Sequence, residues 1–325
     1  MKVLLLGATG LLGHNVLLQL VDAGHEVVAL VRHAEGIHLS TDGWQTVVGS
    51  ALDIDTLRCA AEGCQAVVNC VGATDMSLRH IDDFRPANCK LPALVVDMME
   101  ELGIATLVHT STVNTIGHGS ATHPADEQTP MQAPFNRSLY ALSKLEGEQV
   151  VRQAAQRHPR WHAVVICPGF MLGAWDVKPS SGRMLQAAYR RPLMAAPPGG
   201  KAFVAVADVA TAIVHALDHG ANGERYIVAG QNMSIADLYR LQASTMGYRQ
   251  RLFLLPRWLM ASAGMAGDIL RACGLRTELS SNNLRQLSVH EYYDGSRAAR
   301  ELDITYTSIA EAIKQYHQWK EDTRR

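Results

Sequence analysis

The N-terminal part of the chain alternates between short apolar runs and a helical pattern. Val3–Leu6 is a continuous apolar run of strand length, and the glycine-containing segment Gly7–Gly13 follows it directly. Apolar residues then recur at helical spacing as far as Ala23, where Gly24 favours the end of a helix. A second strand-like run, Glu26–Val31, comes next. This order of strand, turn, helix and strand predicts a βαβ unit.

The same alternation continues along the chain. The runs of strand length are almost wholly apolar, as expected of parallel strands that helices cover on both faces. The pattern therefore predicts an α/β fold of the Rossmann type, a doubly wound parallel sheet. The further elements that it predicts are strands at Thr46–Val48, Ala66–Cys70, Thr106–Thr110 and His162–Cys167, and helices at Ile54–Ala61, Leu91–Leu102 and Tyr140–Gln156.

The rhythm loosens after Pro168, where residues rich in Gly, Pro, Ser and Met predict loops and one helix. A helix at Asp208–His219 and a strand at Arg225–Val228 return to the main domain, and mostly helices follow. We therefore expect a dinucleotide-binding domain, a smaller and mostly helical C-terminal substrate lobe, and a C-terminal helix. Their expected residues are 1–168 with 201–230 for the domain, 169–200 with 231–295 for the lobe, and 296–325 for the helix.

Composition narrows the classes of function. Apolar residues make up 47% of the 325 residues and charged residues 19%, and the formal net charge is −1. This balance provides a sizeable core and no bulk attraction to nucleic acid. The 14 histidines lack metal-ligand spacing, so no metal site is expected. The six cysteines form no CxxC pair and are expected to be free thiols, which predicts a cytoplasmic protein.

One stretch outside the predicted core is unusually apolar. It runs from Leu252 to Leu275, and Pro256, Asp268 and Arg271 interrupt it, so stable membrane insertion is not expected. Helices of the core or the lobe are the expected structure. An interfacial contact with lipid is the alternative, because amphipathic helices can lie on a membrane surface.

The glycine segment after the first strand predicts a dinucleotide site. Gly7, Gly10 and Gly13 stand in GxxGxxG spacing between a strand and a helix. Glycine permits a tight turn and lets the backbone approach a pyrophosphate, which would rest on the N-terminus of the following helix. The intervening residues of the turn that are expected to contact the cofactor are Thr9, Leu11 and Leu12.

The end of the second strand bears on which cofactor is used. An acidic residue about 20 positions after the glycines holds the ribose hydroxyls in NAD-preferring folds, and this chain has Arg32 there. A guanidinium would pair with a 2′-phosphate, so NADP is the preferred expectation. Glu35 keeps NAD open as the alternative. Val71 and Gly72, directly after a predicted strand, are also expected to bind the cofactor.

A tyrosine and a lysine one helical turn apart suggest acid/base chemistry. Tyr140 and Lys144 lie at positions i and i+4 of a predicted helix. A tyrosine hydroxyl has a pKa of about 10, and an ammonium nearby would lower it. A hydroxyl just past the carboxyl end of a parallel strand could polarise the substrate oxygen. Thr112 is the first candidate for that role and Ser111 the second.

Together these segments resemble the extended short-chain dehydrogenases/reductases, within the NAD(P)-dependent epimerase/dehydratase superfamily. Both the dihydroflavonol-reductase-like branch and the nucleotide-sugar epimerase-like branch stay open. The matching segments span almost the whole chain: Gly7–Gly13, Asp53, Thr110–Thr112 before Gly117, Tyr140–Lys144 with Glu148, Pro168–Gly169, and Asp294–Ala298. The resemblance implies that Asp53 contacts the adenine and that the Pro168 loop lies near the nicotinamide. It implies Tyr140 as the acid/base, Lys144 as its activator, Thr112 as the hydroxyl partner, and a homodimer.

Three functions stay open at this point. The first is an NADP-dependent oxidoreductase that transfers hydride to or from a small carbonyl or hydroxyl substrate. The second is a nucleoside-diphosphate-sugar epimerase with retained NAD. Val113 and Asn114, rather than Asp-Glu, follow Thr112, which argues against a sugar dehydratase. The third is a dinucleotide-sensing or scaffold protein, which is disfavoured because this chain keeps both the glycine turn and the Tyr–Lys pair.

Overall fold

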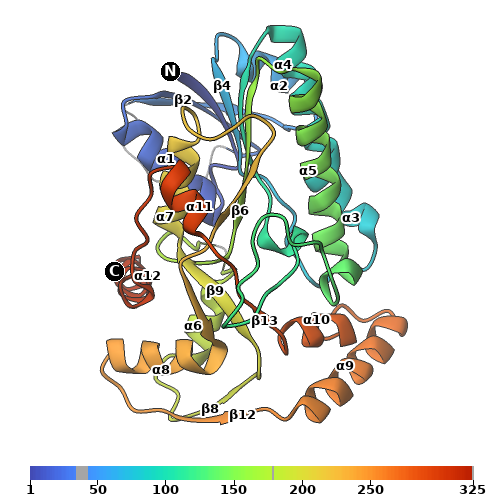
Figure 1. The fold of residues 1–325 in the computed structure, drawn as a ribbon, viewed down its shortest axis with the longest axis vertical. Helices are drawn as coiled ribbons and strands as arrows, with labels where there is room; N and C mark the ends of the chain where they lie inside the picture. The colour runs from blue at the N-terminus through green and yellow to red at the C-terminus, as the bar shows by residue number, and fades with distance from the viewer. Residues whose placement is uncertain (34–42, 178, 324–325) are drawn as a thin grey trace.

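A computed structural model describes residues 1–33, 43–177 and 179–323. Its larger part is built on a seven-stranded sheet in the order β10-β6-β5-β4-β1-β2-β3 (Figure 1). Every neighbouring pair in this sheet is parallel, which confirms the predicted Rossmann fold. The strands are β1 (Lys2–Leu6), β2 (Glu26–Val31), β3 (Trp44–Val48), β4 (Ala66–Asn69), β5 (Thr106–Thr110), β6 (His162–Pro168) and β10 (Arg225–Val228).

Helices cover both faces of this sheet, and the apolar pattern of the strands explains why. Successive residues of a strand point to opposite faces, so Val3 and Leu5 join one core cluster while Leu4 and Leu6 join the other. All four are fully buried. The helices on the two faces are α1 (Leu11–Asp22) and α7 (Val206–His215) on one, and α2 (Ile54–Ala61), α4 (Leu91–Leu102) and α5 (Leu139–Arg157) on the other (Figure 1).

The smaller lobe contains more strands than its sequence suggests. A second sheet and a two-stranded ribbon accompany its helices. The sequence pattern does not reveal these short strands, because their pairing partners are far away in the chain. The second sheet holds β11 (Gln231–Ser234), β9 (Gly200–Ala205), β13 (His290–Glu291) and β7 (Phe170–Leu172). The ribbon pairs β8 (Leu193–Ala196) with β12 (Arg251–Leu254), and the helices are α6 (Gly182–Ala188), α8 (Ile235–Thr245), α9 (Arg257–Ala272) and α10 (Ser281–Gln286).

Two segments divide between the domain and the lobe differently from the sequence pattern. Within 201–230, α7 and β10 return to the Rossmann part, whereas β9 lies in the lobe's sheet. The C-terminal segment holds two helices rather than one, α11 (Ser296–Glu301) and α12 (Ile309–Asp322). Asp208 accepts hydrogen bonds from the amide and hydroxyl of Thr307 between them, so α7 anchors this connection.

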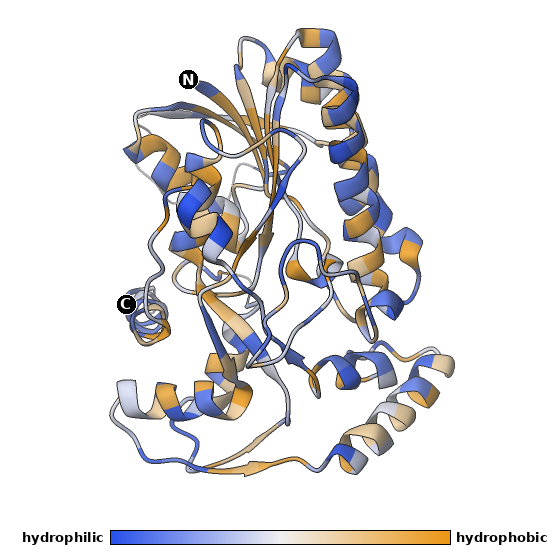
Figure 2. Ribbon diagram, in the orientation of Figure 1, coloured by the Kyte–Doolittle hydropathy of each residue, from blue (hydrophilic) through white to orange (hydrophobic). Residues whose placement is uncertain are grey.

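Hydropathy follows this division of the molecule. Hydrophobic residues concentrate along the central strands of the large sheet, and they also line β12 at the lower end of the lobe (Figure 2). Within the described ranges, no helix combines the length and the apolar character needed to cross a bilayer.

Candidate active site

The glycine turn packs so closely that side chains would not fit. A Cβ on Gly13 would lie 2.0 Å from the carbonyl oxygen of Gly7, and Gly7 itself has φ +91° against the backbone of Cys70 and Val71. Gly10 is the N-cap of α1, and among the described residues no side chain caps that end. The first-turn amides of α1 are therefore directed at an exposed turn, as a bound pyrophosphate requires.

The rim around this turn carries Arg32 and Asp53. Arg32 is exposed directly after β2, and the structure shows no partner for it within the described residues. Asp53 is the N-cap residue of α2 and accepts a hydrogen bond from Thr56 at 2.5 Å. That bond lowers the pKa of the Asp53 carboxyl. Glu35, the residue that kept NAD open, lies outside the described residues.

The segment after β4 places the predicted cofactor contact Gly72 next to Lys144. A Cβ on Gly72 would lie 3.8 Å from Lys144 Nζ and 3.6 Å from Asn88 Oδ1. Asn88 is fully buried and pairs with both backbone groups of Ala73, accepting from its amide at 2.8 Å and donating to its carbonyl at 3.1 Å. Val71 precedes Gly72 at this edge. Asn88 therefore fixes the backbone that borders the predicted site.

Asn88 owes its position to an irregular helix. It lies in a π-helical segment, η1 (Pro86–Lys90), between α3 (Ile81–Arg85) and α4. A Cβ on Gly147 of α5 would lie 1.9 Å from the carbonyl oxygen of Asn88, so glycine allows α5 to approach this turn. π-Helical turns are frequent at functional sites. The sequence pattern gave no role to Asn88; its only local signal is the pair Pro86 and Pro92 that bracket the turn.

The structure brings three of the predicted catalytic residues together at the carboxyl end of β5. The Thr112 hydroxyl lies near Tyr140 and acts to lower its pKa. Lys144, one turn further along α5, is buried and donates to the carbonyl of Thr110 at 2.6 Å. The α5 helix begins at Ser138, whose hydroxyl accepts from the amide of Ala141. This cap fixes where Tyr140 enters the site.

Burial shifts the proton affinities of both groups in the cofactor-free protein. It raises the pKa of the half-buried Tyr140, against the opposing effect of the Thr112 hydroxyl. It also lowers the pKa of Lys144 to about 8. The sequence argument expected Lys144 to lower the pKa of Tyr140. In this structure the shift has the opposite direction, because desolvation is its largest cause.

Ser111 has a different partner from Thr112. Its hydroxyl donates to Glu148 at 2.7 Å, and Thr115, in the short helix η2 (Val113–Thr115), donates to the same carboxylate at 2.8 Å. Arg225 of β10 donates to the other oxygen of Glu148 at 3.1 Å. Glu148 is fully buried. Ser111 is thus engaged in joining β5 to α5, and Thr112 has the hydroxyl that faces Tyr140.

Pro168 closes the site on the β6 side. It is the last residue of β6 and pairs in register with Val228 of β10. The chain then enters the lobe through β7 and reaches Trp175, whose ring lies 4.2 Å from the ring of His14 on α1. The segment after Pro168 therefore packs over the first turns of α1, beside the predicted cofactor site.

The fold and this arrangement define a dinucleotide-dependent enzyme, and comparison with known proteins agrees. The model of the NAD dependent epimerase/dehydratase family matches residues 3–229. The chain belongs to this family, and it is an NAD(P)-dependent oxidoreductase or epimerase. This enzymatic assignment argues against the scaffold alternative.

Two curated relatives align along nearly the whole chain. A putative dihydroflavonol 4-reductase from Synechocystis sp. is 26% identical, over 96% of this chain and 92% of the relative. Sterol demethylase protein B from Methylococcus capsulatus is 29% identical, over 98% of each. Among solved structures, UDP-glucose 4-epimerase from Thermotoga maritima shares the fold, with a TM-score of 0.79, 16% identity and 100% of both chains covered.

Proposed function

We propose that this protein is an NADP-dependent oxidoreductase of the extended short-chain dehydrogenase/reductase type, with Tyr140 as its acid/base. The observation that carries the proposal is that the Thr112 hydroxyl lies near Tyr140 after β5, with Lys144 one turn away on α5. This group lies beside the glycine turn at the carboxyl edge of the parallel sheet, where ligands of such folds bind. Arg32 at the end of β2 supports NADP over NAD.

The residues divide the work as follows. When bound, the nicotinamide supplies or accepts the hydride. Thr112 orients the substrate oxygen, and the Tyr140 hydroxyl gives it a proton during reduction or takes one during oxidation. Lys144, one turn from Tyr140 on α5, would stabilise a tyrosinate and would hydrogen-bond the ribose hydroxyls of the cofactor. The turn residues Gly7–Gly13, with Gly72 and Pro168, would hold the cofactor.

The substrate is proposed to be a small carbonyl or hydroxyl compound with an apolar body. Both curated relatives are named for chemistry on hydrophobic ring systems, a dihydroflavonol and a sterol. A cytoplasmic homodimer in which α5 contributes to the interface completes the proposal; light scattering on the purified protein tests the dimer.

Replacing Tyr140 by Phe tests the acid/base assignment. The hydroxyl is lost while the ring remains, so kcat should fall about 10²- to 10⁴-fold. The affinity for NADPH should stay nearly unchanged, because the hydroxyl faces the substrate. Turnover is measured as NADPH oxidation with a panel of aryl and alicyclic ketones, and affinity by fluorescence titration.

Tyr239→Phe provides the matched control. Tyr239 is a buried tyrosine of α8, in the lobe, and its loss should leave turnover intact. If Tyr140→Phe retains turnover, the acid/base assignment is wrong. Turnover of a sugar nucleotide without net oxidation of NADPH would instead support the epimerase alternative.

A further inference from the structure

The outer face of α9 is apolar and exposed. Trp258, Met265 and Ile269 are 69%, 58% and 65% exposed. Their spacing of seven and four residues places them on one face of the helix. Large apolar side chains exposed along one helix face favour a contact surface over ordinary surface variation.

The inner face of α9 holds the helix in this orientation. Met260, Gly264 and Gly267 are its buried residues. A Cβ on Gly264 would lie 2.8 Å from Ser281, and one on Gly267 would lie 2.5 Å from the carbonyl oxygen of Leu279, so the two glycines let α10 pack closely. Trp258, Met265 and Ile269 therefore face outward, because the opposite face of α9 packs against α10 and the residues before it.

The neighbouring ribbon also carries exposed apolar side chains. Phe253 and Leu254 of β12, and Leu193 of β8, are each about half exposed or more. Both β12 and α9 form the end of the lobe furthest from the Rossmann sheet (Figures 1 and 2). We refer to these six side chains as the α9–β12 face: Leu193, Phe253, Leu254, Trp258, Met265 and Ile269.

Arginines are frequent in the segment that contains most of the α9–β12 face. From Arg249 to Arg285 the chain has six arginines and two acidic residues. Both acidic residues are engaged: Asp268 accepts from the amide of Ser281, and Glu278 pairs with Arg183. The segment between these limits is therefore a cationic part of a chain with a net charge of −1.

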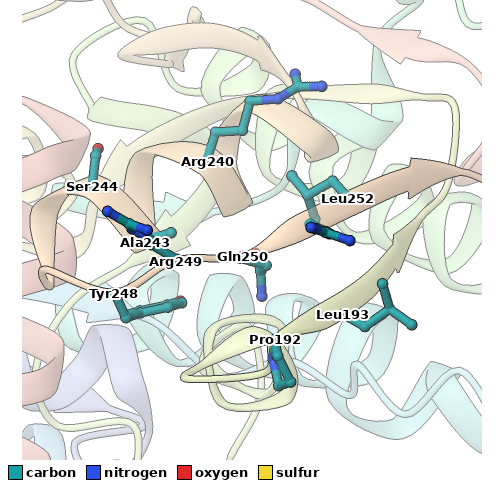
Figure 3. Close-up of a pocket in the computed structure, with 10 residues that line it drawn as sticks. Pro192, Leu193, Arg240, Ala243, Ser244, Tyr248, Arg249, Gln250 and Leu252 are labelled. Atoms are coloured by element: carbon teal, nitrogen blue, oxygen red, sulfur yellow. The ribbon is translucent and has the colours of Figure 1, made fainter.

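Some of this charge gathers in a cavity beside β12. A pocket of about 810 Å³ is lined by Arg240 of α8 and by Arg249 and Arg251 at the start of β12, together with Leu193 and Leu252 (Figure 3). Arg240 pairs with Asp237. Among the described residues, Arg249 and Arg251 have no carboxylate within 4.0 Å. Apolar residues and unneutralised guanidinium groups are thus next to one another.

We propose that the α9–β12 face docks on the surface of an anionic phospholipid bilayer. Exposed aromatic and aliphatic residues enter the interface, and arginines bind lipid phosphates and carboxylates. With 16 residues, α9 is too short to span the membrane. A second copy of the chain fits this face less well, because a two-fold contact would set the arginines of one copy against those of the other.

The side of α9 opposite the proposed lipid contact packs against the segment after Gly72. On its inner side α9 reaches the segment after Gly72, since Arg271 donates to the carbonyl of Leu78 at 2.8 Å. Asn283 of α10 donates to the carbonyl of Met76 in the same segment. Both α9 and α10 therefore contact the segment that follows the predicted cofactor contact Gly72. The docking proposal does not depend on the reaction assigned above.

Flotation with vesicles tests the proposal. The full-length protein is mixed with vesicles of phosphatidylcholine alone or of phosphatidylcholine with phosphatidylglycerol. It should float with the anionic vesicles, and high salt should weaken this binding. Trp258→Ser with Ile269→Ser should weaken the partition coefficient about tenfold or more. Arg249→Gln with Arg251→Gln should weaken it roughly fivefold per charge on anionic vesicles only.

Matched controls separate this face from general surface effects. Leu102→Ser removes an exposed leucine of α4, and Arg160→Gln removes an exposed arginine distant from the lobe; neither should change flotation. Circular dichroism checks that each variant is folded. Absence of wild-type flotation, or equal loss in the control variants, overturns the proposal. The proposal is also overturned if the wild type does not float and Trp258→Ser converts a dimer to a monomer. The α9–β12 face would then be an interface between two copies of the chain.

Discussion

At the scale of single residues, the hydroxyls of Ser111 and Thr112, which follow β5, face different residues of α5. Thr112 lies near Tyr140, whereas the Ser111 hydroxyl donates to Glu148, two turns further along the same helix. A carboxylate that holds Ser111 in place leaves Thr112 as the hydroxyl available to substrate. The sequence favoured Thr112 over Ser111 as the hydroxyl that contacts substrate, because of their position after a strand. The partner of Ser111 depends on how α5 packs, which local sequence does not specify.

The buried ammonium of Lys144 predicts a pH dependence of stability. Its pKa is about 8 in the folded protein, and about 10.4 in an unfolded chain. Between these values the unfolded chain keeps a proton that the folded protein releases. The free energy of unfolding should therefore rise with pH across this window, and the benefit is absent below it.

Lys144→Met provides the comparison, because it keeps an unbranched side chain of similar length without the charge. Denaturant unfolding of the cofactor-free proteins, measured at several pH values from about 7 to about 10.4, should show the rise in the wild type and not in the variant. Parallel curves for the two proteins would mean that Lys144 titrates normally.

At the scale of elements, α5 connects the chemistry to the sheet. Its Glu148 side chain receives hydrogen bonds from Ser111 and Thr115 after β5 and from Arg225 of β10. Glu148→Ala would leave a guanidinium and two hydroxyls without this acceptor in a buried setting. We expect a loss of about 3–5 kcal/mol in the free energy of unfolding.

Denaturant titration of Glu148→Ala measures this loss. Gln149→Ala, an exposed neighbour on the same helix, should change the free energy of unfolding by less than about 0.5 kcal/mol. A similar stability for both variants would show that the Glu148 network contributes little.

The elements that sequence could locate are those with strong local patterns. Strands such as β1 are continuous apolar runs, and α2 has the predicted bounds Ile54–Ala61. In contrast, β13 has two residues and exists only because β9 lies beside it. The π-helical turn at Asn88 likewise depends on its contact with Gly147 of α5. Such features come from contacts between distant segments, which periodicity does not reveal.

At the scale of the whole molecule, the Rossmann part and the lobe meet around the predicted site. The glycine turn, Gly72 and Lys144 border it from the domain, and the segment that contains Trp175 packs against α1 from the lobe side. The cofactor would therefore lie at the junction of the two parts, and its identity decides between the oxidoreductase and the epimerase.

The most direct test of this account is a fluorescence titration of the purified protein with NADPH and NADH, combined with analysis of any nucleotide that it retains on isolation. We expect preferential binding of NADPH, a site free of retained nucleotide, and an Arg32→Ala variant that loses about ten- to a hundredfold in NADPH affinity but little in NADH affinity. Retained NAD with a weak response to NADPH would contradict the account and favour the epimerase.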